Sequence, residues 1–351
     1  MRKYAVRGHP KSCRRVVEVR VYQSTIHLVN PLFSPHGGSE HRTLNYFALL
    51  SPRADVTLWA LKEPHHEFSH LPFRRLDRAG RNLPEGGTLV LVGIYGVWTG
   101  APWLTRIRPD RLIIVYNTPE FAKLHDLLDF VPRTRLPEPE LVFPSESHRA
   151  LARLPGFVDW GLYDFEKFRP AQRVPHSAGF TVGRLSRDTP DKHHPRDVRL
   201  YRHLAEQGMK IRLMGASVFR EHLRDCEAIE FLDTGQVEAS DFLQSLDAFV
   251  YRTHPRWFEA AGRVVVEAMA CELPVVVGRA GGYAELIEHG TNGFLFDTQV
   301  EAAEYLAMLR ADPALARGIG RAARSTVIDR FGDEHIERVC RFFLQPPDQR
   351  R

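Results

Sequence analysis

The sequence lacks the features of a membrane-spanning or a disulfide-bonded protein. Its 351 residues contain no run of about 18 consecutive apolar residues, the length needed to cross a bilayer. The basic N-terminus is not followed by the apolar core of a secretory signal. The cysteines stand singly, without the pairing of a zinc site or a disulfide framework, at Cys13, Cys226, Cys271 and Cys340. We therefore expect a protein of the reducing cytoplasm, with peripheral attachment to a membrane as an open alternative.

Two further absences bear on function and organisation. No D-x-D triplet occurs in the chain, so a divalent metal that bridges phosphates is not indicated, and fixed cations with a helix terminus can take its place. No internal repeat or low-complexity segment is visible. With 43% apolar and 26% charged residues the chain is an ordinary globular one, long enough for two domains of about 150 to 180 residues each.

The formal net charge of +5 is concentrated at the N-terminus, where residues 1–20 hold seven basic side chains and one acidic side chain. Such a basic arm suits contact with an anionic membrane surface or with a nucleic acid. A solvated arm without a partner is the more ordinary outcome for a charged segment.

The most informative stretch runs from Tyr251 to Asp297. Within it, Gly262 follows two alanines and opens an apolar helical pattern, so the N–H groups of about residues 261 to 264 have no carbonyl partner earlier in the helix. Free N–H groups at a helix start attract an anion, and small side chains let a phosphate come close. Glu259 in the loop and Glu267 inside the helix are placed to bind sugar and ribose hydroxyls. A bare pair of glutamates at this spacing is more often a solvated helix face.

The rest of the chain alternates short apolar runs with helical patterns, which is typical of parallel α/β sheets. We expect buried strands at about residues 24–30, 55–61, 88–93, 111–117, 140–147, 178–183, 209–215, 228–233, 247–253 and 274–278. We expect helices after the paired glycines at 37–38 and at about residues 194–207, 217–224, 238–245, 300–310, 312–331 and 334–345.

The residues from Glu259 to Gly278 read EAAGRVVVEAMACELPVVVG and are followed by GGYAELI and HGTNGFLF. Over about forty residues this resembles the nucleotide-sugar site of the family 4 glycosyltransferases (glycosyl transferases group 1), whose pattern is close to E-x-x-G-x-x-x-x-E-A-M-A-x-G-x-P-V-V. Glu272 departs from it, because the family usually has Gly after the helix; the side chain strains the cap by about 1 kcal/mol. The resemblance implies a GT-B fold, with two doubly wound parallel-sheet, Rossmann-like domains facing across a cleft.

The resemblance also implies roles for residues that match the family's motifs. Gly183, Arg184 and Lys192 match a G-R-x(n)-K element whose two cations hold the donor diphosphate. Gly37 and Gly38 match a loop that lies over that diphosphate. The expected donor-binding set is Gly37, Gly38, Gly183, Ala260, Ala261, Gly262, Arg263, Val264 and Glu267. The expected catalytic set is Glu259, Arg184 and Lys192.

On the acceptor side the candidates are His36, Tyr95 and Asn117. Related enzymes often end the corresponding strand with a His-Asn pair, but here Tyr116 stands in the His position and Asn117 remains. Tyr95 follows an apolar strand and lines an acceptor pocket or packs a helix onto the sheet. The sequence offers no residue that we can assign as a protein nucleophile. The resemblance implies that the acceptor attacks the sugar on the same face that the diphosphate leaves.

The expected domains are residues 1–170 on the acceptor side, residues 177–333 on the nucleotide-sugar side, and a final helix in 334–351 that returns to the first domain. The residues VDWGLYDFEKFRP resemble the family's interdomain connector, and Pro170 to Ser177 is a polar linker by composition. A hinge there lets two lobes close on a ligand.

These observations favour a retaining, metal-independent glycosyltransferase that uses a nucleoside diphosphate sugar as co-substrate and needs no cofactor. An epimerase of the same fold is an alternative, and it would release an altered sugar nucleotide without an acceptor. A non-catalytic binder of nucleotide sugars or glycans is another, and it would bind a donor without hydrolysing it. The acceptor class stays open among small molecules, lipids, glycans, proteins and nucleic acids.

Overall fold

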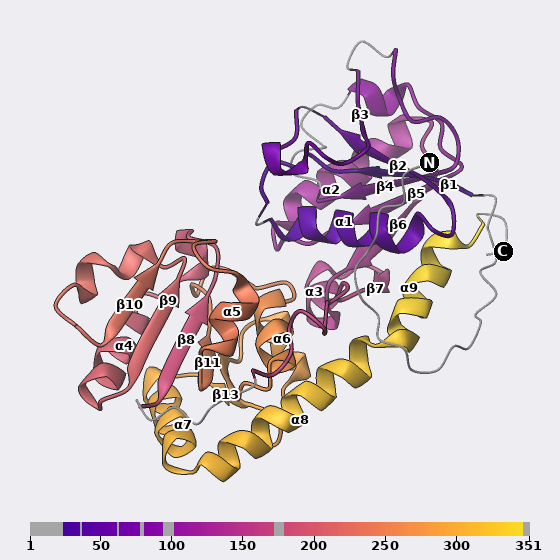
Figure 1. The fold of residues 1–351 in the computed structure, drawn as a ribbon. Helices are drawn as coiled ribbons and strands as arrows, with labels where there is room; N and C mark the ends of the chain where they lie inside the picture. The colour runs from indigo at the N-terminus through magenta and orange to yellow at the C-terminus, as the bar shows by residue number, and fades with distance from the viewer. Residues whose placement is uncertain are drawn as a thin grey trace.

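The computed structural model describes residues 24–35, 37–61, 63–77, 81–93, 102–171 and 179–346. In it the chain forms two α/β domains that face one another and are joined along one side (Figure 1). The N-terminal arm of residues 1–20, His36, Tyr95 and most of the expected linker lie outside the described residues. None of the described helices is both long enough and apolar enough to cross a membrane.

The first domain is built on a seven-stranded parallel sheet in the order β3-β2-β1-β4-β5-β6-β7. Its strands are β1 (Thr25–Val29), β2 (Asp55–Ala60), β3 (Phe73–Arg75), β4 (Thr88–Val92), β5 (Arg111–Val115), β6 (Pro139–Phe143) and β7 (Phe157–Val158). The central strands β4 and β5 are buried at every residue, as their continuous apolar runs require when helices cover both faces of a sheet. The helices are α1 (Gly38–Leu50), α2 (Phe121–Phe130) and α3 (Glu146–Ala152).

The second domain has a six-stranded parallel sheet in the order β10-β9-β8-β11-β12-β13. Its strands are β8 (Thr181–Leu185), β9 (Lys210–Met214), β10 (Ile229–Leu232), β11 (Ala248–Tyr251), β12 (Val275–Gly278) and β13 (Phe294–Phe296). The α-helices are α4 (Asp197–Glu206), α5 (Ala239–Gln244), α6 (Arg263–Ala270), α7 (Gln299–Ala311) and α8 (Pro313–Phe331). In both sheets the strand order reverses next to the first strand of the domain, which is where an open α/β sheet forms its ligand crevice.

The prediction of one helix at 217–224 was wrong. The segment forms two short 3-10 helices, Ser217–Phe219 and Glu221–Leu223, that meet at Arg220. Phe219 and Leu223 are both buried. A pair of short 3-10 helices buries the two side chains as well as one α-helix would. Over so short a stretch, packing outweighs the helix propensity of the residues.

The last helix, α9 (Asp333–Leu344), crosses back from α8 onto the first domain, where it lies near α1 and β6 (Figure 1). Val339 and Phe343 are buried in one apolar cluster with β1 residues such as Ile26. The buried guanidinium of Arg111 in β5 donates to the carbonyl of Phe342 at 2.9 Å and to Glu140 Oε1 at 2.6 Å. A cation from the sheet thus holds the C-terminal end of α9, where helix carbonyls lack partners.

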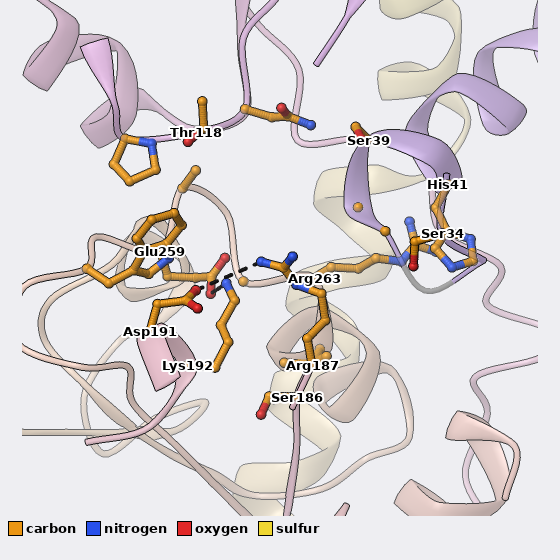
Figure 2. A pocket seen from close by; sticks show the side chains of 18 of the residues that line it. Ser34, Ser39, His41, Thr118, Ser186, Arg187, Asp191, Lys192, Glu259 and Arg263 are labelled. Carbon is orange, nitrogen blue, oxygen red and sulfur yellow. Dashed lines mark hydrogen bonds and ion pairs between the residues drawn. The ribbon is translucent and has the colours of Figure 1, made fainter. Parts of the chain in front are cut away.

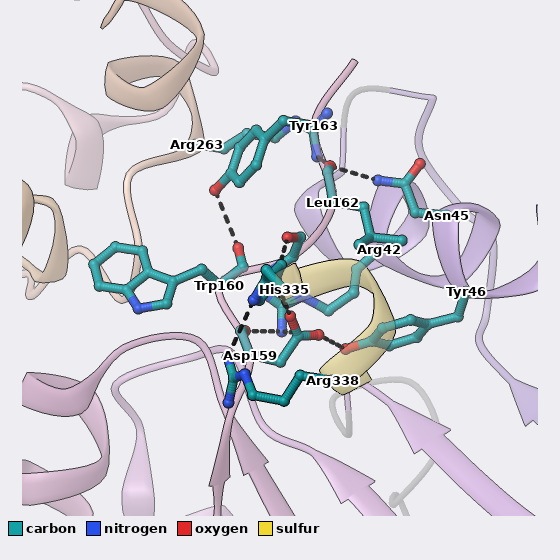
Figure 3. A network of polar contacts seen from close by, with 11 residues as sticks. Arg42, Asn45, Tyr46, Asp159, Trp160, Leu162, Tyr163, Arg263, His335 and Arg338 are labelled. Carbon is teal, nitrogen blue, oxygen red and sulfur yellow. Dashed lines mark hydrogen bonds and ion pairs between the residues drawn. The ribbon is translucent and has the colours of Figure 1, made fainter. Parts of the chain in front are cut away.

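A buried polar cluster around Asp159 holds the segment that leads from β7 to the second domain (Figure 3). The Tyr46 hydroxyl donates to Asp159 Oδ2, Arg42 Nη1 lies 3.8 Å from the same oxygen, and His335 Nε2 lies 3.3 Å from Oδ1. Burial alone would raise the pKa of Asp159. The hydrogen bond with His335, the charge of Arg42 and the bond from Tyr46 outweigh burial and hold this pKa well below its usual range. Because Arg42 and Tyr46 lie in α1 and His335 in α9, the cluster joins two helices to the connector.

Candidate active site

A cavity of about 580 Å³ lies between the two domains (Figure 2). Its first-domain wall comes from residues of 34–41, after β1, and 117–119, after β5; its second-domain wall comes from residues of 186–192, after β8, and 251–264, at and after the end of β11. All four segments begin at or follow the carboxyl end of a parallel strand, the edge where ligands bind in open α/β sheets. The cavity is therefore where the fold places a ligand site.

Glu259 and Lys192 form a charged pair in the wall of the cavity (Figure 2). Lys192 Nζ lies 2.5 Å from Glu259 Oε2, and the two side chains are 9% and 15% exposed. The Tyr251 hydroxyl donates to the same carboxylate oxygen at 2.9 Å. Lys192 Nζ also lies 5.5 Å from the centroid of the Trp257 ring, within cation–π range. Two donors thus fix the direction of the Glu259 carboxylate while the pair still borders open space.

Two helix starts point toward this cavity from opposite domains. In the second domain Gly262 caps α6 with φ 76°, a left-handed conformation, and a Cβ there would come within 2.5 Å of the Tyr283 ring. In the first domain Gly37 caps α1, and a Cβ there would collide with the Glu40 carboxylate. Gly38 borders the cavity as well. Free N–H groups at a helix start and the positive end of the helix dipole both favour a bound anion.

A smaller cavity of about 110 Å³ adjoins the first and shares Gly38, Asn117, Glu259 and Arg263 with it. Ala261 lines this smaller space, whereas Val264 lines the larger one, and Ala260 and Gly262 line both. Eight of the expected residues besides Glu259 and Lys192 are therefore brought to the same two spaces: Gly37, Gly38, Asn117, Ala260, Ala261, Gly262, Arg263 and Val264.

Arg184 and Gly183, which were expected at the diphosphate, lie buried in β8 of the second domain. The Arg184 side chain is fully buried; its guanidinium donates to the carbonyls of Lys192 and Arg252 and lies 4.8 Å from the centroid of the Tyr251 ring. Gly183 lies within β8, where a Cβ would meet Leu246 at 2.3 Å. Neither is among the described residues that line the two cavities. Arg184 supports the backbone of Lys192 from behind the cavity wall.

Glu267 is likewise absent from the described residues that line the two cavities. Its side chain is 8% exposed, and Oε1 accepts a hydrogen bond from Arg263 Nε at 2.7 Å. Burial raises the pKa of Glu267, and the charge of Arg263 opposes that effect. Oε1 of Glu267 is therefore bonded to an arginine four residues earlier on the same helix, and that arginine itself lines both cavities.

Several lining residues escaped the sequence-based expectations. Arg187 and Asp191 lie between Arg184 and Lys192, and their side chains approach to 3.9 Å. Thr118 follows Asn117 directly. Their position in loops already singled out was the only signal in the sequence. The residue in the family's His position, Tyr116, is buried, and its hydroxyl donates to the carbonyl of Glu120.

Metal-ligand spacing occurs away from the cavity. Among the described residues, the grouping of His65, His66 and Glu67 brings potential ligand atoms within 4.8 Å of one another. These residues lie at the start of the 3-10 helix His66–Phe68, before β3, and are not part of the described walls of either cavity. The charged groups that line the larger cavity are cationic and carboxylate side chains, and they include the Lys192–Glu259 pair.

Residues 180–326 match the family described as glycosyl transferases group 1. Over these residues the chain resembles a group 1 glycosyltransferase domain. This domain holds Lys192, Glu259 and the α6 start. A curated relative, N-acetyl-alpha-D-glucosaminyl L-malate synthase of Bacillus anthracis, is 40% identical over 81 residues, which are 22% of this chain and 21% of the relative. The chain thus spans about a fifth or less of the length of the first curated relatives it matches.

Solved structures extend the likeness from the group 1 glycosyltransferase domain to nearly the whole chain. Anabaena HepE in complex with UDP and glucose superposes with a TM-score of 0.71 at 18% identity, covering 92% of this chain and 100% of that chain. Sucrose-phosphate synthase from Thermosynechococcus elongatus gives a TM-score of 0.70 at 16% identity, covering 92% and 99%. These likenesses and the two parallel sheets confirm the predicted GT-B fold.

Proposed function

We propose that this protein is a retaining glycosyltransferase that moves a sugar from a nucleoside diphosphate sugar to an acceptor hydroxyl. The observation that carries the proposal is the Lys192–Glu259 pair beside the α6 start, in one cavity between the two domains of a chain with a group 1 glycosyltransferase domain. The HepE structure, which shares the fold, was solved with UDP and glucose. That complex supports a nucleoside diphosphate sugar as the donor class.

The diphosphate is assigned to the α6 start, opposite the α1 start. Lys192, Arg187 and Arg263 line the same cavity and add positive charge. As the donor breaks, negative charge grows on the leaving diphosphate, and donors already aimed at that charge lower the barrier. With these fixed cations and N–H groups we propose that transfer needs neither a metal nor a cofactor.

Glu259 is assigned to the sugar. Its carboxylate is fixed by Lys192 and Tyr251, and it borders the cavity, so it can accept hydrogen bonds from sugar hydroxyls. The bond between the anomeric carbon and the diphosphate oxygen breaks through an oxocarbenium-like state. The acceptor oxygen forms the new bond on the same face, and its proton passes to an oxygen of the leaving diphosphate. The products are the glycoside and the nucleoside diphosphate.

A panel of nucleoside diphosphate sugars, screened by thermal shift, tests the donor class. A true donor should raise the melting temperature, and the rise should grow with the logarithm of donor concentration above Kd, because a ligand that binds only the folded state stabilises it. Nuclear magnetic resonance of the hydrolysis or transfer product should then show a retained anomeric configuration, and activity should persist with a chelator present. Inversion, a requirement for added metal, or release of an epimerised sugar nucleotide would contradict the proposal. Failure of the whole panel to shift the melting temperature would contradict it as well.

A further inference from the structure

A set of contacts from the first domain meets the Glu259 loop on the side of helix α3. We propose that Ser145 and Glu285 are positioning residues that fix the backbone around Glu259 when the two domains are closed. Ser145 belongs to the first domain and Glu285 to the second, in the 3-10 helix η8 (Gly282–Leu286). The role in transfer rests on the proposed function of Glu259; the coupling of α3 to the loop stands on geometry alone.

Ser145 holds the loop directly. Its side chain is buried, and its Oγ donates to the carbonyl of Ala260 at 2.6 Å, across 115 residues of sequence. The same Oγ accepts a hydrogen bond from the N–H of His148 at 3.1 Å, which caps the start of α3. One hydroxyl thus joins a helix start in the first domain to the residue that follows Glu259 in the second.

Glu285 reaches in the opposite direction, from the second domain to the first. Its Oε1 accepts from the N–H of Ser147 at 2.5 Å and its Oε2 from the N–H of Glu146 at 3.2 Å. A carboxylate beside N–H groups at a helix start makes charge-assisted hydrogen bonds, which are stronger than neutral ones. These two bonds cross between the domains, and they have the distances of true hydrogen bonds only while the domains stay together.

The η8 segment that carries Glu285 also holds Glu259 itself. The N–H of Gly282 donates to the carbonyl of Glu259 at 2.7 Å. A Cβ at Gly282 would lie 2.3 Å from the carbonyl oxygen of Ala260 and 2.6 Å from Ser145 Oγ. The three segments are therefore packed too closely for any side chain at this position, and a shift of η8 must move the carbonyl of Glu259.

A third contact lies one residue before Glu259. The rings of Phe258 and His148 stack at 6.4 Å with an interplanar angle of 20°. His148 Nε2 lies 2.9 Å from the carbonyl oxygen of Thr118, a residue of the first-domain cavity wall. Phe258, Glu259 and Ala260 are thus each held by α3 or by η8, so domain closure at α3 is transmitted to the Glu259 backbone.

The experiment compares Ser145→Ala and Glu285→Gln in the full chain, with Ser147→Ala and Glu288→Gln as matched controls. Ser147→Ala keeps the backbone N–H that Glu285 contacts, and Glu288 is exposed two residues after η8. Hydrogen exchange of residues 260–264, measured without ligand, reports the loop itself and does not depend on the proposed activity. Donor affinity by calorimetry and kcat form the second readout.

We expect exchange of the loop amides to rise about tenfold and kcat to fall about tenfold in both variants. Ser145→Ala loses the two hydrogen bonds of the hydroxyl, and Glu285→Gln loses the negative charge that strengthens its two hydrogen bonds. Donor affinity should fall as well, because residues 260–264 include the α6 start to which the diphosphate is assigned. Ser145→Thr should restore both readouts by restoring the hydroxyl.

Loop exchange equal to that of the controls in both variants would overturn the proposal, whatever the activity. If the wild-type chain uses no sugar nucleotide, the proposed function fails, while faster loop exchange still supports the coupling. Should Ser145→Ala not fold, the half-buried Glu285→Gln decides alone.

Discussion

Two clusters in this protein pair a carboxylate with a cation and a tyrosine hydroxyl, yet they stand in different surroundings. At the cavity, Glu259 has Lys192 and Tyr251. At the connector, Asp159 has Arg42 and Tyr46, with His335 in addition. Glu259 remains 15% exposed and borders about 580 Å³ of open space, whereas Asp159 is fully buried.

The difference shows that the chemical groups alone do not decide what such a cluster does. A carboxylate whose oxygens are enclosed by donors on every side holds segments together, as Asp159 holds α1, α9 and the connector. A carboxylate fixed by two donors but open on another side can accept hydrogen bonds from a ligand, as proposed for Glu259. Space beside the carboxylate therefore separates a binding group from a structural joint.

The largest effect on stability is expected at Asp159. Asp159→Asn should lower the free energy of unfolding by about 3–5 kcal/mol, because it leaves the buried Arg42 without its counter-charge. Urea denaturation at neutral pH measures this, with the exposed Asp164→Asn as a control expected to stay within about 0.5 kcal/mol. Since the pKa of Asp159 is lowered on folding, its stabilisation is present above the unfolded pKa of about 3.9 and is lost as the pH falls below it. An unchanged free energy of unfolding in Asp159→Asn would mean that the cluster around Asp159 does not hold α1, α9 and the connector together.

At the cavity the same kind of change should spare stability and remove activity. Glu259→Gln and Lys192→Ala should each lower kcat by about 10²–10³-fold, equivalent to about 3–4 kcal/mol of transition-state stabilisation. The melting temperature should change little, because water in the cavity can solvate the remaining partner. Lys210→Ala, an exposed lysine at the start of β9, is the control for loss of positive charge. Normal turnover with reduced stability in both variants would place this cluster beside Asp159 as a structural one.

The two regions should differ in how their contribution to the free energy of unfolding depends on pH. Burial lowers the pKa of His148, which packs against Phe258 beside the cavity, to about 4. A histidine with a lowered pKa stabilises the fold fully above its unfolded value of about 6.5, and this stabilisation falls as the pH drops toward 4, by up to about 3 kcal/mol. Unfolding free energies between pH 7.5 and 4.5 should show this slope, and His148→Phe should reduce it. The Asp159 cluster should persist through this range, so an equal slope in His148→Phe would contradict the assignment.

The smallest expected effect lies at the far end of α6 and separates stability from both clusters. Glu272 adopts φ 60°, in the left-handed region where a side chain is strained. Glu272→Gly should raise the free energy of unfolding by about 0.5–1 kcal/mol, the relief of strain less the added freedom of the unfolded chain. Thermal and urea unfolding measure this gain, and kcat should stay unchanged. A loss of stability would show that the Glu272 side chain makes a contact that outweighs the strain.

Much of the fold was predictable because its strands are short, continuous apolar runs. β4, β5 and β12 are buried throughout, as their sequences indicate. The α6 start was predictable from Gly262, where the small side chain and left-handed backbone are local requirements. Strained Glu272 was predictable in the same way, from its place after the helix.

The tertiary partnerships were not predictable. Lys192 and Glu259 are 67 residues apart and meet only because β8 and β11 are adjacent strands. Arg184 carries the family's motif as clearly as Lys192 does, and only the packing of Tyr251 against it shows that it supports the wall and does not face the cavity. Asp159 looked like an ordinary connector residue, since the donors that surround it come from helices at opposite ends of the chain.

The placement of α9 also bears on how the molecule is made. Part of the apolar interior of the first lobe is supplied by Val339 and Phe343, which leave the ribosome after the entire second lobe. The first domain, which is synthesised earlier, therefore keeps part of its apolar surface exposed until α9 has been translated. A nascent chain stalled before Asp333 should be a chaperone client.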